Sequence, residues 1–372
     1  MEKKHVIPKS IKTKFKNFYW ALFIAITAIS LFGLLFIHAA SYHIEGWTNT
    51  FVIKQSLWLL IGIFFLFAIT FIGYRPFLNI SYLIYICSFL LLVSVFFIGT
   101  EKLGAQRWIP LGGFALQPSE FSKLAVILTL SHYLGSRKQN LFQKKRFIIS
   151  FLLTFIPLIL IVKQPDLGTA LIFLPILYCM LFVWGAKIKY ILISILLGII
   201  SLPVIWHILK DYQRTRLLTF ININADPLGS GYTAIQSKIA VGSGELWGKG
   251  LFCGTQNRLN FVPEHHTDFI FCVIGEEGGF LAAISLILLF FIIMKLSISV
   301  IQKTTDPEAQ LLAAGITAML IIQIFINMGM TIGLCPITGL PLPFISYGGS
   351  SLITYLSAFG FLISIYKERS IF

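Results

Sequence analysis

The segment Phe261–Asp268, which reads FVPEHHTD, ends the longest polar interruption of the chain, residues 209–267. A long apolar run begins directly after it at Phe269, and most of the remaining sequence is also apolar. The segment therefore brings a carboxylate to the mouth of an apolar helix, next to a loop that contains many Gly, Lys and Arg residues. Water, charge and an amphiphilic molecule can meet at such a position.

The composition excludes an ordinary soluble domain. Of the 372 residues, 57% are hydrophobic and 12% are charged. A soluble fold cannot bury that much apolar surface, whereas a helix that crosses a bilayer needs about 20 mostly apolar residues. We therefore expect an all-α polytopic membrane protein, with residues 1–372 forming one membrane-embedded domain of about ten transmembrane helices. The expected spans lie near residues 19–41, 51–73, 78–98, 118–134, 147–163, 167–185, 188–208, 268–294, 309–332 and 343–366.

The distribution of basic residues predicts the orientation. The formal net charge of +14 would by itself suggest a nucleic-acid partner, but the basic residues alternate by loop. Cytoplasmic loops carry the excess of Lys and Arg, so both termini are expected in the cytoplasm and the large 209–267 loop, between spans seven and eight, outside it. We accordingly expect contact with membrane lipids and no nucleic acid. The basic clusters assigned to the cytoplasm lie at residues 3–16, 75, 137–146, 187–189, 295–303 and 367–369.

Charged side chains within apolar helices are candidates for function, because inserting one costs about 2.5 to 3.5 kcal/mol. Glu120 and Lys123 are three residues apart and share one helix face. They are either a self-neutralising pair that lets the helix enter the membrane, or a pair that faces a water-filled cavity and positions an anionic head group. Asp166 follows Pro165 in a short turn, where it caps the next helix or contributes to a site.

Four carboxylates surround the quoted segment: Glu264, Asp268, Glu276 and Glu277. Asp268 is either the N-cap of the eighth span or a functional acid. The neighbouring residues His265 and His266 would point about 100° apart on a helix, which is poor geometry for a shared metal ion.

Two loops complete the candidate site. Basic residues of the 209–267 loop suit phosphate oxygens; they are Arg214, Arg216, Lys238, Lys249 and Arg258. Residues 333–351 are apolar but interrupted by Pro and Gly, and irregular backbone at membrane depth survives only inside protein or beside a cavity. We expect this second loop to form a wall of the same site.

Several segments resemble the signatures of one family, the SEDS family (shape, elongation, division and sporulation) of bacterial membrane glycosyltransferases. They occur in the expected order and span most of the chain: Gln117–Glu120, Gln164–Thr169, Pro263–Phe269 and Ile345–Ser351. Two more are closer to the RodA branch of cell elongation than to the FtsW branch of division: Gln236–Ala240 followed by Gly254–Gln256, and Pro336–Pro343.

The resemblance implies a ten-span enzyme of the bacterial cytoplasmic membrane that polymerises lipid II into peptidoglycan strands on the outer face. Asp268 matches the family's essential aspartate, and Glu120 with Lys123 matches a cavity-lining pair. The implied partners are a class B penicillin-binding protein and the MreB-linked elongation machinery, and the implied cofactor is Mg²⁺ or Mn²⁺. This chain has His265 where the family pattern has Arg, so the resemblance carries no cation role to that position.

The reaction needs a base for a sugar hydroxyl and positive charge for a departing lipid pyrophosphate. We expect Asp268 to be the base, with a pKa raised by burial, and a metal ion, if bound, to use Asp268 with a nearby carboxylate. The expected substrate-binding residues are Glu120, Lys123, Arg107, Asp166, Lys238, Glu264, His266 and Ser346. Two alternatives stay open: a lipid II flippase, since transporters also hold charges amid many spans, and a non-catalytic scaffold of the elongation machinery.

Overall fold

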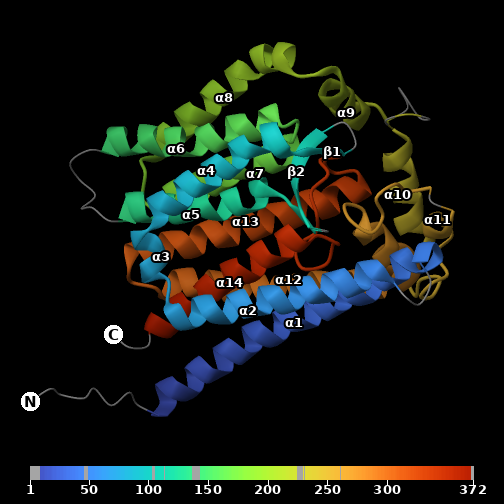
Figure 1. Ribbon diagram of the computed structural model, residues 1–372, viewed down its shortest axis with the longest axis horizontal. Helices are drawn as coiled ribbons and strands as arrows, with labels where there is room; N and C mark the ends of the chain where they lie inside the picture. Colours follow the sequence, from blue (N-terminus) through green and yellow to red (C-terminus); the bar gives the residue numbers. More distant parts are fainter. Residues whose placement is uncertain are drawn as a thin grey trace, which may run out of the picture.

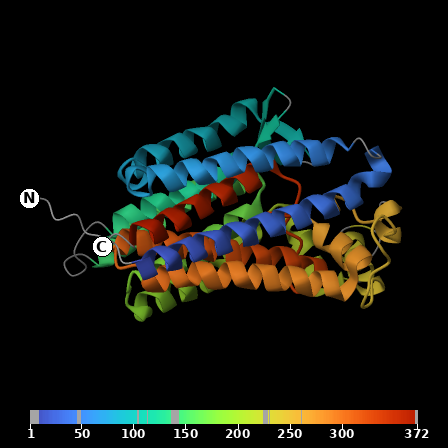
Figure 2. The same cartoon turned by 90° about the horizontal axis from the view of Figure 1, so that it is seen from below.

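A computed structural model describes residues 9–45, 49–102, 105–112, 114–135, 143–223, 229, 231–259 and 261–369. Long helices run side by side along the long axis of the molecule, and the strands lie with α9, α10 and α11 toward one end (Figures 1 and 2). The first half contains α1 (Lys9–Glu45), α2 (Thr50–Ile72), α3 (Arg75–Asn79), α4 (Ser81–Ile98), α5 (Pro118–Gly135), α6 (Gln143–Lys163) and α7 (Leu167–Val183). The second half contains α8 (Ile188–Ile208), α9 (Asp211–Ile221), α10 (Tyr232–Ser243), α11 (Thr255–Arg258), α12 (Ile270–Lys303), α13 (Pro307–Ile332) and α14 (Gly349–Arg369).

Seven helices of the described ranges are long and apolar enough to cross a membrane. They lie in α1, α2, α4, α6, α12, α13 and α14, and two shorter apolar helices occupy Leu167–Val183 and Ile188–Val204. The expected span at 118–134 forms α5, a helix that lies inside the bundle and carries Glu120 and Lys123. The chain is therefore a predominantly helical membrane protein, as predicted.

The centre of the bundle is built from α5, α13 and α14. In α14, 89% of the most apolar stretch is buried, compared with 22% in α4 and in α6. Small residues on α14 allow neighbouring helices to pack closely against it. At Gly360, for example, a Cβ would stand 2.8 Å from the carbonyl oxygen of Leu66 on α2. The outer helices turn their large apolar side chains outward, as expected where lipid is the solvent.

The ends of several helices follow local rules. Asn49 accepts backbone hydrogen bonds from Phe51 and Val52 at the start of α2, and Asp306 accepts one from Glu308 at the start of α13. Gly333 ends α13 in the left-handed conformation, with φ of 80°. The start of α1 and the end of α14 lie at the same end of the bundle, opposite α9, α10 and α11 (Figure 1). The basic residues 3–4 and 137–138 and the loop residues 224–228 lie outside the described residues.

The prediction of an all-α chain missed a small sheet. Residues between α4 and α5 form three antiparallel strands, β1 (Thr100–Lys102), β2 (Ala105–Leu111) and β3 (Phe114–Leu116), with β2 in the middle. The strands are too short to show a two-residue periodicity against the surrounding apolar sequence. The sheet matters for the candidate site, because β2 contains Arg107 and lies toward the same end of the molecule as α9 and α10.

Two predicted helix limits were also wrong. The last span begins at Gly349 rather than near 343, because residues 339–348 are irregular and contain Gly and Pro. The eighth span, α12, continues to Lys303 rather than ending near 294, and it is broken at Gly279, where φ is 65°.

The large loop is bound to α12 next to this break. The break exposes backbone groups that the loop satisfies: Lys249 and Gly250 donate to the carbonyl oxygens of Glu276 and Glu277, each at 3.0 Å. The side chains of the two glutamates also bind the loop. Glu276 Oε1 accepts a hydrogen bond from Lys249 Nζ at 2.7 Å, and Glu277 Oε2 accepts one from the backbone N–H of Phe252 at 2.8 Å. Both glutamates are buried. They are therefore anchors of the loop, and the four-carboxylate cluster expected from the sequence divides into two parts with different roles.

Candidate active site

The backbone of residues 264–268 is fixed from two sides. Ser346 Oγ donates to the carbonyl oxygen of Thr267 at 2.6 Å, and Tyr347 N donates to that of His266 at 3.1 Å. On the other side, Asn327 Nδ2 of α13 donates to the carbonyl oxygen of Asp268 at 2.8 Å. The segment Glu264–Asp268 is therefore held by hydrogen bonds to α13 on one side and to the loop before α14 on the other.

Asp268 does not cap α12. The N-cap position belongs to Phe269, which makes no side-chain capping hydrogen bond. The capping alternative for Asp268 is therefore wrong, and its carboxylate is available for another role. Gly339 leaves the space for it: with φ of 72°, a Cβ at this glycine would stand 3.2 Å from Asp268 Oδ2.

The Asp268 side chain lines a cavity of about 510 Å³ at the loop end of the bundle. This volume is in the range of small-molecule sites. Residues from α2, β2, α9 and the two irregular segments meet there, so the wall expected from residues 333–351 is present, formed by Gly339, Pro341 and residues 347–351. The charged residues of the lining are Lys54, Arg107, Arg216, Glu264 and Asp268. Among the described residues that line the cavity, three cationic side chains against two carboxylates favour an anionic ligand.

Burial raises the pKa of the Asp268 carboxyl from an ordinary 3.8 to about 7. The negative charges of Glu264 and Asp166 act in the same direction, and the positive charges of Arg107 and Arg216 oppose them. A carboxyl group in this range can both take and release a proton near neutral pH. The cavity thus contains one acid with the properties of a general base.

Arg107 reaches the cavity from β2 and is held by the turn before α7. Its guanidinium lies 3.7 Å from Asp166 Oδ1 and also contacts the carbonyl oxygen of Pro165. Asp166 is buried and caps α7, accepting from Thr169 N at 3.2 Å and from Thr169 Oγ1 at 2.8 Å. The capping interpretation of Asp166 is therefore confirmed, and its carboxylate lies beside Arg107.

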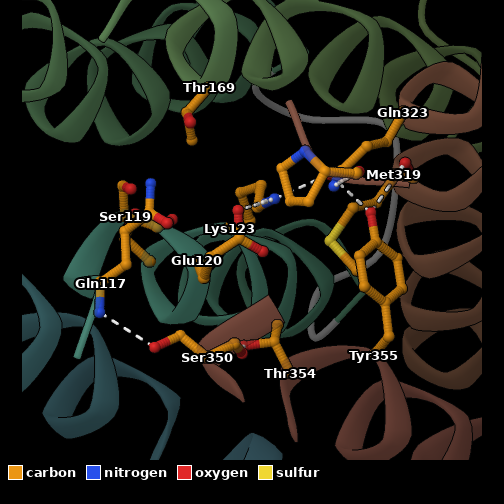
Figure 3. Close-up of polar contacts among 12 residues, drawn as sticks. Gln117, Ser119, Glu120, Lys123, Thr169, Met319, Gln323, Ser350, Thr354 and Tyr355 are labelled. Carbon is orange, nitrogen blue, oxygen red and sulfur yellow. Dashed lines mark hydrogen bonds and ion pairs between the residues drawn. The ribbon is translucent and has the colours of Figure 1, made fainter. Parts of the chain in front are cut away.

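Glu120 and Lys123 belong to a network of buried polar side chains (Figure 3). Lys123 Nζ donates to Glu120 Oε1 and to Gln323 Oε1, each at 2.8 Å, and Tyr355 OH donates to the same Gln323 oxygen at 2.7 Å. Glu120 and Lys123 have no exposed surface. The prediction that this pair faces a water-filled cavity was wrong, and the self-neutralising alternative is correct. Gln323, which in turn donates to the carbonyl oxygen of Pro341 at 2.8 Å, links the network to the cavity wall.

The other predicted residues lie in different places. Glu264 and His266 line the cavity with Asp268, and the His266 ring packs 4.7 Å from that of Phe51. Ser346 is buried and positions backbone, accepting from Leu342 N at 2.7 Å in addition to its bond to Thr267. The prediction of a substrate contact for Ser346 was therefore wrong. Lys238 lines a second, smaller cavity.

His265 has a structural position in this site. Its side chain is buried, with Nδ1 3.0 Å from the carbonyl oxygen of Val262 and Nε2 3.1 Å from that of Ala40 on α1. Backbone carbonyl oxygens only accept, so a doubly protonated ring donates to both, whereas a neutral ring donates to one. The ring ties α1 to the segment that carries Asp268.

Three site residues were missed by the sequence interpretation: Lys54, Gln55 and Asn327. Gln55 of α2 donates to the carbonyl oxygen of Ser346 and accepts from Gly348 N, both at 3.1 Å. The only feature of the sequence that could have indicated these residues is their polarity, since each is a polar residue within or near an apolar run.

The described side chains do not by themselves provide enough ligands for a metal ion. Among the described residues, no three His, Cys, Asp or Glu side chains are grouped so that they could hold an ion. Glu264 and Asp268 provide two carboxylates in one cavity, and the charge of Glu264 helps to raise the pKa of Asp268. Mg²⁺ commonly binds through one or two carboxylates together with substrate phosphates, so the donor set fits an ion that arrives with a phosphate ligand.

Comparison with known proteins covers nearly the whole chain. A family model for FtsW, RodA and SpoVE, described as "Cell cycle protein", matches residues 19–371. The peptidoglycan glycosyltransferase MrdB of Escherichia coli K12 is 38% identical over 298 residues, which cover 80% of this chain and 79% of MrdB. The peptidoglycan glycosyltransferase RodA of Treponema pallidum is 31% identical over 422 aligned residues, covering 94% of this chain and 97% of that protein.

The fold agrees with these relationships. A chain of a solved peptidoglycan synthase complex, in which polymerization and crosslinking are structurally coordinated, superimposes with a TM-score of 0.80 at 29% identity. The match covers 94% of this chain and 98% of the other. The chain described here belongs to the FtsW/RodA/SpoVE family, which is the SEDS family that its sequence segments resemble.

Proposed function

We propose that the cavity around Asp268 is the site at which this peptidoglycan glycosyltransferase joins lipid II molecules into a glycan strand. The single observation that carries the proposal is a carboxyl group with a pKa of about 7 in a cavity whose described lining also includes three cationic side chains. The family supplies the reaction, and the cavity supplies the two kinds of group that the reaction needs.

Asp268 acts as the general base in this account. Its ionised form accepts the proton of the 4-hydroxyl of one lipid-linked disaccharide, and that oxygen forms a bond to the anomeric carbon of the other. The bond from the anomeric carbon to the lipid pyrophosphate breaks, and the pyrophosphate leaves with the bonding electrons. A pKa near 7 allows Asp268 to take the proton and release it to water afterward.

Positive charge on the cavity wall stabilises the departing pyrophosphate. Lys54, Arg107 and Arg216 all line the cavity, and Arg107 is oriented by the buried Asp166. Guanidinium groups match phosphate oxygens in pairs of hydrogen bonds. Stabilisation of this kind, from groups already in position, is often the largest contribution to catalysis.

A divalent cation is part of the proposal. Asp268 and Glu264 would hold Mg²⁺ or Mn²⁺ together with phosphate oxygens of the substrate, and the ion would neutralise charge on the pyrophosphate. Glu120 and Lys123 support the cavity floor through Gln323 rather than contacting substrate.

The membrane orientation follows the charge distribution. Basic loops at the end that holds the start of α1 and the end of α14 favour a cytoplasmic location for that end. The Asp268 cavity then opens on the extracytoplasmic side of the cytoplasmic membrane, and the chain crosses the membrane an even number of times, ten by our proposal. A class B penicillin-binding protein that cross-links the strands, and the MreB-linked machinery, are the proposed partners.

The test uses purified protein and lipid II, with and without a class B penicillin-binding protein, and measures glycan strands on a gel. We expect strands from the parent protein and none from Asp268→Asn. The matched control is Asp211→Asn, because Asp211 is fully exposed at the start of α9 and lies in neither cavity. Strand synthesis that survives in Asp268→Asn would remove Asp268 from the mechanism.

The flippase alternative has its own test. Vesicles that contain only this protein and labelled lipid II would show transbilayer movement of the label without polymer if the chain were a flippase. The scaffold alternative predicts that Asp268→Asn supports rod growth in cells that lack the parent protein. We expect neither result.

A further inference from the structure

Three other segments of the chain bind α1 near its second end. Three consecutive residues of α1 each accept a hydrogen bond from outside the helix there. The bonds run from Asn257 Nδ2 to the carbonyl oxygen of Ala39 at 3.4 Å, from His265 Nε2 to that of Ala40 at 3.1 Å, and from Asn49 Nδ2 to Ser41 Oγ at 2.5 Å. Residues Ala39–Ser41 are buried and are here called the α1 junction. The junction connects α11, the segment that carries Asp268 and the start of α2.

Two of these connections lead directly to the Asp268 cavity. Asn49 is the N-cap of α2, and Phe51 and Lys54, in the first turns of that helix, line the cavity. His265 lies three residues before Asp268. The α1 junction therefore holds both a cationic residue of the cavity wall and the acid on the opposite segment.

His265 makes the direct link from α1 to the segment of Asp268. Its Nδ1 bond to the carbonyl oxygen of Val262, at 3.0 Å, stays within the same stretch of chain, whereas its Nε2 bond to Ala40 reaches another helix. The bond to Ala40 needs a proton on Nε2, which a neutral ring can carry as well as a charged one. The link therefore depends on the position of the ring nitrogen and does not require a positive charge.

The same helix supports the Asp268 segment from a second direction. Gly33 of α1 packs directly on the irregular segment before α14, since a Cβ there would stand 2.7 Å from Ile345 Cα. The next residue, Ser346, donates to the carbonyl oxygen of Thr267 at 2.6 Å. The backbone on both sides of Thr267 is therefore referred to α1, through Ser346 and through His265.

We propose that His265 is a positioning residue for Asp268. Its Nε2 bond to Ala40 holds the Asp268 segment at a fixed place on α1, and so sets the distance between the Asp268 carboxylate and Lys54 at the start of α2. The proposal rests on the proposed function, because it matters only if Asp268 is the base. A small displacement of a catalytic group lowers the rate strongly, so loss of this one bond reduces turnover without removing any group that touches the substrate.

The test separates the two bonds of the ring. The amide nitrogen of glutamine lies where Nε2 of histidine does, and that of asparagine lies where Nδ1 does. His265→Gln therefore keeps the donor to Ala40, and His265→Asn keeps the donor to Val262. Each variant loses one of two hydrogen bonds, so their thermal midpoints should agree within a few degrees, and a difference in activity between them reports positioning.

Strand synthesis is measured over a range of lipid II concentrations. We expect kcat to fall by at least about tenfold in His265→Asn, and by no more than about threefold in His265→Gln. KM for lipid II should stay unchanged in both, because the bond acts on the base and not on binding. The control is His207→Leu, which removes another bond between a histidine ring and a backbone carbonyl, that of Pro203 on α8, at an exposed residue that lines neither cavity. It should leave kcat at the parent's value.

Three results would overturn the proposal. The first is equal kcat in His265→Gln and His265→Asn, which would make the bond to Ala40 irrelevant to turnover. The second is a change in KM with kcat preserved, which would make His265 a substrate contact. The third is an equal loss of kcat in His207→Leu. Asp268→Asn in the same assay tests the proposed function separately: if it is inactive while His265→Asn keeps the parent's kcat, only the positioning role fails, and if it retains the parent's rate, the role of Asp268 as base fails.

Discussion

Asn327 Nδ2 donates a hydrogen bond of 2.8 Å to the backbone carbonyl oxygen of Asp268. The same amide nitrogen donates to the carbonyl oxygen of Leu340 at 2.6 Å. One buried side chain of α13 therefore fixes the backbone of the proposed base and the backbone beside Gly339, which borders its carboxylate.

Replacing Asn327 with Leu should lower kcat by about 100-fold, because small displacements of a catalytic group are that costly. The matched control is Gln310→Met, which removes another bond from an α13 amide to a backbone carbonyl, that of Ile301, at the opposite end of the helix. Strand synthesis is measured at saturating lipid II, and thermal midpoints report folding. Equal activity in the two variants would contradict the positioning role of Asn327.

Gly339 should tolerate no side chain. In Gly339→Ala, the new methyl group would press on Asp268 Oδ2, and we expect strand synthesis to fall at least about tenfold. Gly185→Ala is the control, because Gly185 has a similar φ of 84° and nothing within 4 Å of its absent Cβ. Both variants should lose about 1 kcal/mol of stability from backbone strain, and only Gly339→Ala should lose activity. A comparable loss of activity in Gly185→Ala would show that strain alone is responsible.

The pH dependence should reflect the ionised form of Asp268. With a pKa of about 7, kcat/KM should rise about tenfold per pH unit at low pH and level off above neutrality. At pH 5 it should lie about 100-fold below the plateau. Initial rates across buffers of constant ionic strength measure this profile, and a rate independent of pH between 5 and 8 would exclude Asp268 as the base.

Stability should change with pH in the opposite direction. The folded state holds the proton of Asp268 up to about pH 7, whereas the unfolded chain releases it near 3.8. The folded state therefore loses stability as the pH rises between these values. Asp268→Asn removes this loss, so its thermal midpoint should exceed the parent's at pH 8 and approach it at pH 4.

The sequence predicted that the chain is a helical membrane protein and predicted several residues of the candidate site. The first prediction came from the apolar runs and the second from short motifs. Apolar runs of sufficient length predicted the helical bundle, because a bilayer requires them. One motif, Pro263–Phe269, predicted that Glu264, His266 and Asp268 belong to the site, and the need for positive charge at the pyrophosphate added Arg107; these four line one cavity. Neither source could show that Glu120 and Lys123 are enclosed, since their shared helix face is the same in both interpretations.

The missed features depend on contacts between distant residues. Asn327 and Gln55 bond to backbone that lies 59 and 291 positions away, and no local pattern reports such a pairing. The strands β1 to β3 form from residues that read as an ordinary loop between two spans. Glu276 and Glu277 were grouped with the other carboxylates because the sequence does not show their bonds to Lys249 and Phe252, which lie 27 and 25 positions earlier in the chain.

The buried pair Glu120 and Lys123 should behave as a structural unit. Lys123→Met leaves a buried carboxylate without its partner and should cost about 3 to 5 kcal/mol of stability. The double variant Glu120→Gln with Lys123→Met should recover much of that loss. Arg75→Met, which breaks the more exposed pair with Glu368, should cost no more than about 1 kcal/mol. The single variant Glu120→Gln completes the cycle. Unfolding in detergent measures the parent and the four variants, and additive effects of Glu120→Gln and Lys123→Met would contradict the coupling.

The most direct measurement is the rate of strand synthesis by purified Asp268→Asn protein at saturating lipid II, compared with the parent and with Asp211→Asn. Removal of a general base predicts a rate at least about 100-fold lower, with lipid II still bound and the protein still folded. A rate within a few-fold of the parent's would contradict the central claim that the Asp268 carboxylate takes the proton from the sugar hydroxyl.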